Sequence, residues 1–145
     1  MKNPQKLAKE LLQIKTIEIQ SKNACCAYVF LWCLGIEPDD IEAIRLVDEA
    51  IVKGYIEPDC TVLWSKWGAA LTGRNIIIEK VSISTIKGIK DRTPVWYTID
   101  GKNGHWVGVQ NGKIEFDPYG IGHSENVKKG KPAAMRRITI GGMVR

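Results

Sequence analysis

A thiol, an imidazole and a carboxylate follow one another along this chain in an order that suits nucleophilic catalysis. Cys25 and Cys26 stand near the start of an apolar segment, His105 opens a strand-like segment much later, and Asp117 ends the next one. A thiol attacks a carbonyl carbon as its thiolate, which a helix amino terminus or a nearby imidazolium favours. The imidazole needs an acid on its other nitrogen to hold the required tautomer. These residues predict acyl chemistry by a Cys-His-Asp triad.

The two adjacent cysteines cannot both face the histidine, because neighbouring residues on a helix are about 100° apart. Considered by themselves, the residues leave both Cys25 and Cys26 open as the nucleophile, and the other one would pack as a small buried side chain. Cys33 and Cys60 are expected to be inert core residues. No pair of cysteines has the Cys-x-x-Cys spacing of zinc sites, so we expect neither a metal nor a cofactor.

The pairing of two predicted strands decides whether His105 and Asp117 can meet. A two-residue turn at 111–112 would place the two side chains on opposite faces of the hairpin. A three-residue loop at 110–112, with its glycine in the left-handed conformation, would pair them directly. The apolar and polar alternation favours the two-residue turn, whereas the catalytic interpretation requires the longer loop. Asp100 is the alternative acid.

The first half of the chain has helical periodicity. The apolar segment Ala24–Leu34 has no polar face, which predicts a helix enclosed by the rest of the domain. Other helices are expected to open at Asp39 or Asp40 and within 59–73. A first helix is expected after Pro4, where apolar residues recur at helical spacing; they are Leu7, Leu11, Leu12 and Ile14.

The second half changes to short segments rich in β-branched and aromatic residues, separated by turn-forming residues. They lie at 75–81, 93–99, 105–110, 113–118 and 135–140. Helices that precede strands indicate an α+β fold with an antiparallel sheet rather than a parallel doubly wound one.

The composition fits a single domain over residues 1–145. The length is close to the commonest domain size, and 44% hydrophobic with 26% charged residues excludes intrinsic disorder. No apolar run approaches the roughly 20 residues that cross a bilayer, and the first residues lack a secretory signal, so we expect a cytoplasmic location without membrane contact. The net charge of +5 is scattered, which favours a solvated surface over a nucleic-acid groove.

Two short motifs carry a family resemblance. They are "QSKNACCAYV" from Gln20 and "GHWVGVQNGKIEFDP" from Gly104. Together they resemble papain-like cysteine peptidases, especially small bacterial and phage-type members similar to the bacteriocin-leader peptidases. In that family a glutamine six residues before the nucleophile helps the cysteine's backbone N–H to form an oxyanion hole. The resemblance implies a papain-like fold, peptide hydrolysis, Cys26 as nucleophile and Gln20 as oxyanion donor.

The sequence departs from the leader-peptidase pattern at two positions, because Ala27 stands where a glycine is usual and a second cysteine precedes the nucleophile. The motif Cys-x-x-Tyr-Val that starts at Cys25 is similar to cell-wall peptidases of the same broad group, so Cys25 remains the alternative nucleophile. The same order of catalytic residues also serves acyltransferases, including transglutaminase-like enzymes and arylamine acetyltransferases. A degenerate peptide-binding module is the non-enzymatic alternative.

Aromatic residues next to the predicted triad suggest a substrate groove. Trp106 and Tyr119 flank His105 and Asp117, and aromatic walls bind extended peptides. The expected partner is thus a peptide or protein substrate, and the residues carry no signal for an oligomeric state. His123 is expected to be a loop residue.

Overall fold

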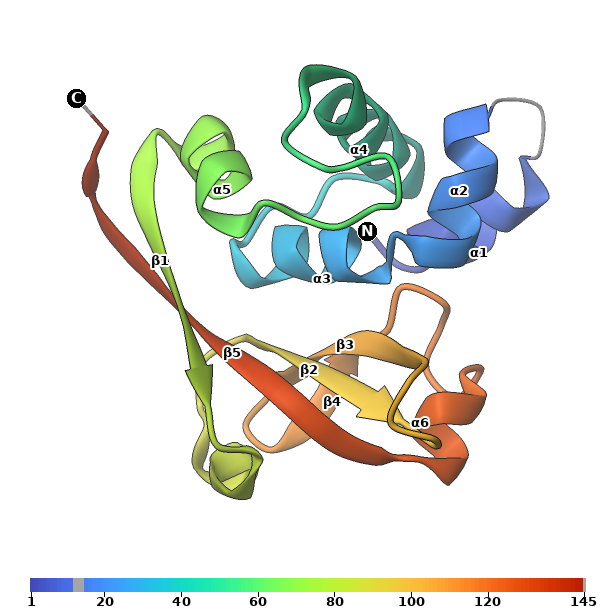
Figure 1. The fold of residues 1–145 in the computed structure, drawn as a ribbon, viewed down its shortest axis with the longest axis vertical. Helices are drawn as coiled ribbons and strands as arrows, with labels where there is room; N and C mark the ends of the chain where they lie inside the picture. Colours follow the sequence, from blue (N-terminus) through green and yellow to red (C-terminus); the bar gives the residue numbers. More distant parts are fainter. Residues whose placement is uncertain (12–14, 145) are drawn as a thin grey trace.

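The computed structural model describes residues 1–11 and 15–144 as a layer of helices packed on an antiparallel sheet (Figure 1). The helical layer precedes the sheet in the chain, and its bounds are α1 Pro4–Glu10, α2 Lys15–Asn23, α3 Cys25–Cys33, α4 Asp40–Lys53 and α5 Trp64–Thr72. A 3-10 helix, η1 Ile83–Gly88, and a short helix, α6 Glu125–Lys129, lie within the second half. The predicted α+β class is confirmed.

The sheet has five strands in the order β1-β5-β2-β3-β4. Each pairs antiparallel with its neighbours, and the bounds are β1 Arg74–Val81, β2 Thr93–Thr98, β3 Gly104–Gln110, β4 Lys113–Phe116 and β5 Lys131–Met143. In Figure 1 the long β1 and β5 run side by side away from the remaining strands, and α5 covers the far end of β1. Every strand predicted from the sequence is present.

Local signals set the helix ends that the sequence predicts. The Asp39 carboxylate accepts a hydrogen bond from the Glu42 amide at 2.8 Å and caps α4, which ends at Gly54 in the left-handed conformation. The helix predicted after Pro4 is present, but Leu12 and Ile14 lie outside the described residues. Within residues 1–11 and 15–144, no helix has the length and apolar character needed to span a membrane.

Helix α3 is enclosed between the other helices and the sheet, as its lack of a polar face requires (Figure 1). Tyr28, Phe30 and Leu31 are fully buried. The ring of Phe30 packs edge-on against Trp64 of α5, with ring centroids 5.1 Å apart, and also contacts Trp67. This core fixes the position of the start of α3 above the sheet.

A second, smaller core covers the opposite face of the sheet. Its fully buried members are Val95, Val107, Val109 and Met135, and side chains of η1 and α6 pack on it. Neither η1 nor α6 is predicted from the sequence, because both spans have too few residues to display helical periodicity. Their presence lets the sheet bury both faces.

The hairpin between β3 and β4 combines a two-residue turn with a bulge. Asn111 and Gly112 have φ of 55° and 74°, and the pairs beside them follow the two-residue register. The register then shifts, so that Gly108 pairs with Phe116 and Glu115 is an extra residue. The observed pairing matches neither of the two predicted hairpins, and the shift turns Asp117 towards the face of His105.

Packing of Phe116 explains the bulge. Without the extra residue, Phe116 would share the face of Ile114, which belongs to the smaller core. With it, Phe116 stacks on Trp32 of α3, with ring centroids 5.9 Å apart and an interplanar angle of 16°. Gly108 leaves the space that Trp32 occupies, since a Cβ there would lie 2.4 Å from the indole Cε3. The contact between α3 and β3 thus depends on a glycine.

Substitution of this glycine should destabilise the protein. Gly108→Ala forces Trp32 to shift, which should lower the free energy of unfolding by about 1–3 kcal/mol. Gly88→Ala is the control, because a Cβ at Gly88 meets nothing within 4 Å. Urea unfolding of both variants measures the difference, and equal stabilities would contradict the role assigned to Gly108.

Candidate active site

The first residue of α3 faces the start of β3. The Trp106 backbone N–H donates a hydrogen bond to the Cys25 sulfur at 3.5 Å. Cys25 is also one of the two groups whose interaction with the neighbouring His105 raises the pKa of the imidazole. Cys25 is 8% exposed. Because the first amides of a helix have no acceptor within it, the start of α3 places partial positive charge at this sulfur. The structure therefore joins a thiol, an imidazole and a helix amino terminus.

The other side of the imidazole meets a carboxylate. His105 Nε2 and Asp117 Oδ1 are 2.6 Å apart, and the Tyr119 backbone N–H donates to the same oxygen at 2.8 Å. Both side chains of the pair are buried, and Asp117 Oδ2 has no hydrogen-bond partner among the described residues. A buried carboxylate next to an imidazole favours the imidazolium form, because the two opposite charges then stabilise each other.

The pKa of His105 follows from opposing effects. Burial lowers it, but the hydrogen bond to Asp117 and the interactions with Cys25 and the Asp117 charge outweigh burial and raise the pKa of His105 to about 9. At neutral pH the imidazole is then protonated and lies between two acidic groups. This is the arrangement that a thiolate nucleophile needs.

Cys26 occupies a different environment from Cys25. It is half-buried, makes no hydrogen bond to His105, and burial together with Cys25 and Cys33 raises its pKa well above the ordinary value, although Arg136 opposes the shift. A neutral thiol is a weak nucleophile. The geometry therefore favours Cys25, the alternative nucleophile of the sequence analysis, over Cys26.

The surroundings of the remaining two cysteines, the half-buried Cys33 and the buried Cys60, disfavour the thiolate. Burial raises the pKa of Cys33 despite the opposing charge of Arg92, and burial with the charge of Asp59 raises the pKa of Cys60 to about 11. Neither forms a disulfide. Cys25 is thus the cysteine whose neighbours suit catalysis.

Gln20 does not reach the thiol. Its amide nitrogen donates to the Ile44 carbonyl oxygen at 3.2 Å, and its amide oxygen accepts a hydrogen bond from the Tyr28 hydroxyl. The side chain is fully buried and ties α2 to α3 and α4. Both the amide nitrogen and the amide oxygen of Gln20 are hydrogen-bonded within the core. Gln20 therefore holds helices together and does not occupy the predicted position in an oxyanion hole.

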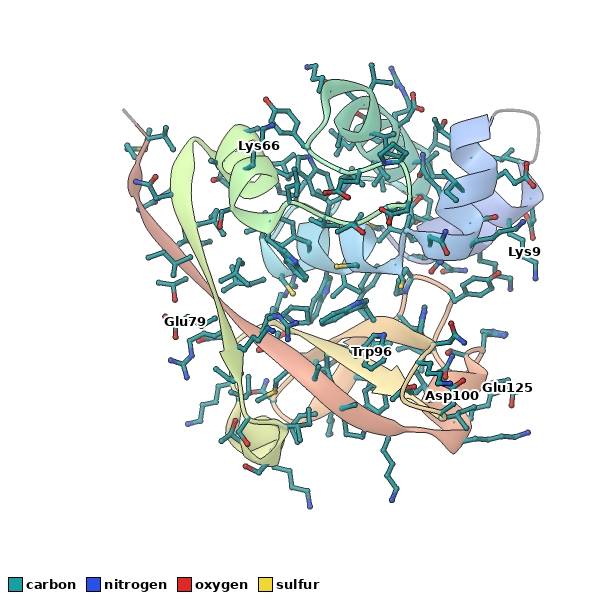
Figure 2. The ribbon with its side chains drawn as sticks, in the orientation of Figure 1. Lys9, Lys66, Glu79, Trp96, Asp100 and Glu125 are labelled. Atoms are coloured by element: carbon teal, nitrogen blue, oxygen red, sulfur yellow. The ribbon has the colours of Figure 1, made fainter. Side chains whose placement is uncertain are left out.

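A groove of about 550 Å³ opens beside Cys25. Asn23 and Cys26 line it on the helical side, and Trp106 and Arg136 line it on the sheet side. Trp96, labelled in Figure 2, contributes a further aromatic wall from β2. The predicted aromatic residue Trp106 therefore lines the groove, whereas Trp96 and Arg136 lie in sequence segments that gave no signal for a site. Asn23 lies within the motif that starts at Gln20, but the motif did not single it out.

The other predicted residues lie away from this groove. Tyr119 contacts the far side of His105, with ring centroids 6.2 Å apart, and lines a separate cavity with His123, an exposed loop residue. Asp100, labelled in Figure 2, is exposed at the turn between β2 and β3. The Asp100 carboxylate accepts hydrogen bonds from the backbone N–H groups of Asn103 and Lys102, and these bonds lower the pKa of Asp100. Asp117 is therefore the acid that meets His105.

Comparisons with known proteins identify no relative of this chain. No family model, no curated protein and no solved structure matches the chain. Among the described residues, no group of three or more His, Cys, Asp or Glu side chains is placed to bind a metal ion.

The two adjacent cysteines should differ in their reaction with iodoacetamide. At limiting reagent and neutral pH, mass spectrometry should locate the label on Cys25, because Cys25 lies at the start of α3 and interacts with His105, whose pKa it raises. Labelling should persist in Cys26→Ala, disappear in Cys25→Ala, and slow at least tenfold in His105→Ala. Preferential labelling of Cys26 would reverse the assignment.

Proposed function

We propose that the protein is a papain-like cysteine peptidase with Cys25 as nucleophile, His105 as acid and base, and Asp117 as the group that orients His105. The observation that carries this proposal is the hydrogen-bonded His105–Asp117 pair next to Cys25, whose sulfur contacts the Trp106 backbone N–H beside an open groove. The order of helices and sheet and the two sequence motifs support it. Peptide hydrolysis is the reaction that these groups suit best.

The first half of the reaction forms an acyl-enzyme. The Cys25 thiolate attacks the carbonyl carbon, the new carbon–sulfur bond forms, and the carbonyl π electrons move to oxygen. The tetrahedral intermediate then expels the amine as the carbon–nitrogen bond breaks, and the His105 imidazolium gives its proton to the amine nitrogen. A thioester and a neutral imidazole remain.

The second half releases the acyl group. His105 takes a proton from water, the hydroxide oxygen attacks the thioester carbon, and the carbon–sulfur bond breaks. The products are a carboxylic acid and the restored thiolate–imidazolium pair. His105 Nε2 stays hydrogen-bonded to Asp117 throughout the reaction. Nδ1 is therefore the nitrogen that exchanges protons with the leaving amine and the water and that faces the sulfur.

Residues at the start of α3 supply the groups that stabilise negative charge on the carbonyl oxygen. The Cys25 backbone N–H belongs to the first helical turn and has no acceptor within the helix. Asn23 ends α2, is exposed and lines the groove, so its side-chain amide is a second donor in place of Gln20. Preorganised donors of this type typically contribute about 2.7–4 kcal/mol each.

Incubation with a complex peptide library tests the proposed activity. Wild-type protein and Cys26→Ala should generate new peptide ends, which mass spectrometry identifies, whereas Cys25→Ala should generate none. In ¹⁸O-labelled water the new carboxyl groups should carry one ¹⁸O, because water attacks the thioester. Products joined to an added amine in preference to water would indicate an acyltransferase, and cleavage that survives in Cys25→Ala would refute the proposal.

The pH dependence of cleavage should reflect the raised pKa of His105. The imidazolium is the proton donor, so kcat/KM should fall as pH rises through about 9, where this group loses its proton. Asp117→Asn removes an interaction that raises the pKa of His105, so its alkaline limb should move to lower pH. Asp100→Asn is the matched control and should leave the profile unchanged. An alkaline limb that is the same in Asp117→Asn would contradict this assignment.

A further inference from the structure

We infer that the groove beside Cys25 selects peptides that carry a carboxylate next to the scissile bond, and that Arg136 binds this carboxylate with help from Lys102. This inference rests on the proposed function and specifies its substrate class. Arg136 lines this groove, and no acidic side chain of residues 1–11 and 15–144 forms an ion pair with it.

Arg136 is held over the wall of the groove by aromatic and backbone contacts. It comes from β5, is half-buried, and its guanidinium carbon lies 5.7 Å from the centre of a Trp106 ring. One nitrogen, Nη1, donates to the Met135 carbonyl oxygen at 3.2 Å. The guanidinium has five N–H donors, so several remain for a ligand in the groove.

The absence of an acidic partner distinguishes Arg136 from a similar arginine elsewhere. Arg92 also stacks on a tryptophan, Trp32, at 4.4 Å, but it forms an ion pair with Glu37 at 3.0 Å. Among the described residues no carboxylate forms an ion pair with Arg136. Arg92 is explained by its structural contacts, whereas the charge of Arg136 is available to a ligand.

The charged residues of the groove favour an anion. Lys22, Lys102 and Arg136 line it together with one acidic residue, Asp59. Lys22 is paired with Glu18 at 3.6 Å, so Lys102 and Arg136 are the cations of the groove that form no ion pair with a described residue. The planar guanidinium fits a carboxylate with two parallel hydrogen bonds, and the Trp96 and Trp106 walls reduce the solvent around it.

The position of Arg136 relative to Cys25 places the carboxylate close to the reacting carbonyl. The backbone N–H of Trp106 contacts the Cys25 sulfur, and the ring of the same tryptophan supports the guanidinium. Arg136 also opposes the raised pKa of Cys26, the neighbour of the nucleophile. A carboxylate bound here belongs to a residue adjacent to the scissile bond.

Two alkylating reagents of nearly the same size provide the test. Iodoacetate carries a carboxylate and iodoacetamide is neutral, and each reacts when the sulfur bonds to the methylene carbon and iodide leaves with the carbon–iodine electrons. The quantity to measure is the second-order rate constant of Cys25 with iodoacetate divided by its rate constant with iodoacetamide. Each rate constant is first normalised to that of free cysteine. The ratio should be high in the wild type and should fall as salt is added.

Single substitutions distinguish the effect of Arg136 on this ratio from the effect of the protein's net charge. Arg136→Gln should lower the ratio about 3- to 10-fold at low ionic strength, as expected from removal of one unit charge several ångströms away. Arg136→Lys should retain most of the ratio, and Lys102→Met should lower it less. The matched control is Arg137→Gln, because Arg137 pairs at 3.6 Å with Glu79, which Figure 2 shows at the outer edge of β1.

The outcomes distinguish this inference from the proposed function. If Cys25 reacts rapidly with iodoacetamide but the ratio is equal in wild type and Arg136→Gln, the inference fails and the proposed function stands. If Cys25 reacts no faster than free cysteine with either reagent, both fail. Should Arg136→Gln not fold, a salt-independent ratio in the wild type would overturn the inference by itself.

Discussion

The extra residue in the β3–β4 hairpin, Glu115, is the constraint on which the arrangement of the site depends. It allows Ile114 to face the smaller core and Phe116 to face the helices, although only one residue separates them. The same shift turns Asp117 towards His105 and makes the 2.6 Å contact possible. Burial of one aromatic ring against α3 therefore sets the position of the carboxylate that holds the imidazole.

The buried helix carries the other half of this constraint. Helix α3 has no polar face, so it is enclosed, and Trp32 near its end contacts Gly108 and Phe116 while Cys25 at its start contacts β3. The two ends of one rigid element thus define the register of the hairpin and the position of the thiol. Stability and chemistry depend on the same interface, because movement of α3 would separate Cys25 from His105.

The sequence predicts those parts of the fold that depend on local signals. Helix caps such as Asp39, the apolar run of α3 and the β-rich segments specify their elements within a few residues. The bulge could not be predicted, because it depends on the distant Trp32. The choice of Cys25 over Cys26 depends on the rotation of α3 about its axis, and Gln20 matched a motif while its side chain is used in the core. Tertiary packing decides each of these features.

The most direct test is an NMR titration of the imidazole of His105 in wild-type protein and in Cys25→Ala. The chain has two histidines, and the exposed His123 serves as the internal reference. In the wild type, His105 should titrate with a pKa of about 9, and its pKa should fall in Cys25→Ala, because the contact with the sulfur is lost. An ordinary pKa near 6.5 that is the same in both proteins would contradict the central claim that Cys25 and His105 form the reactive pair.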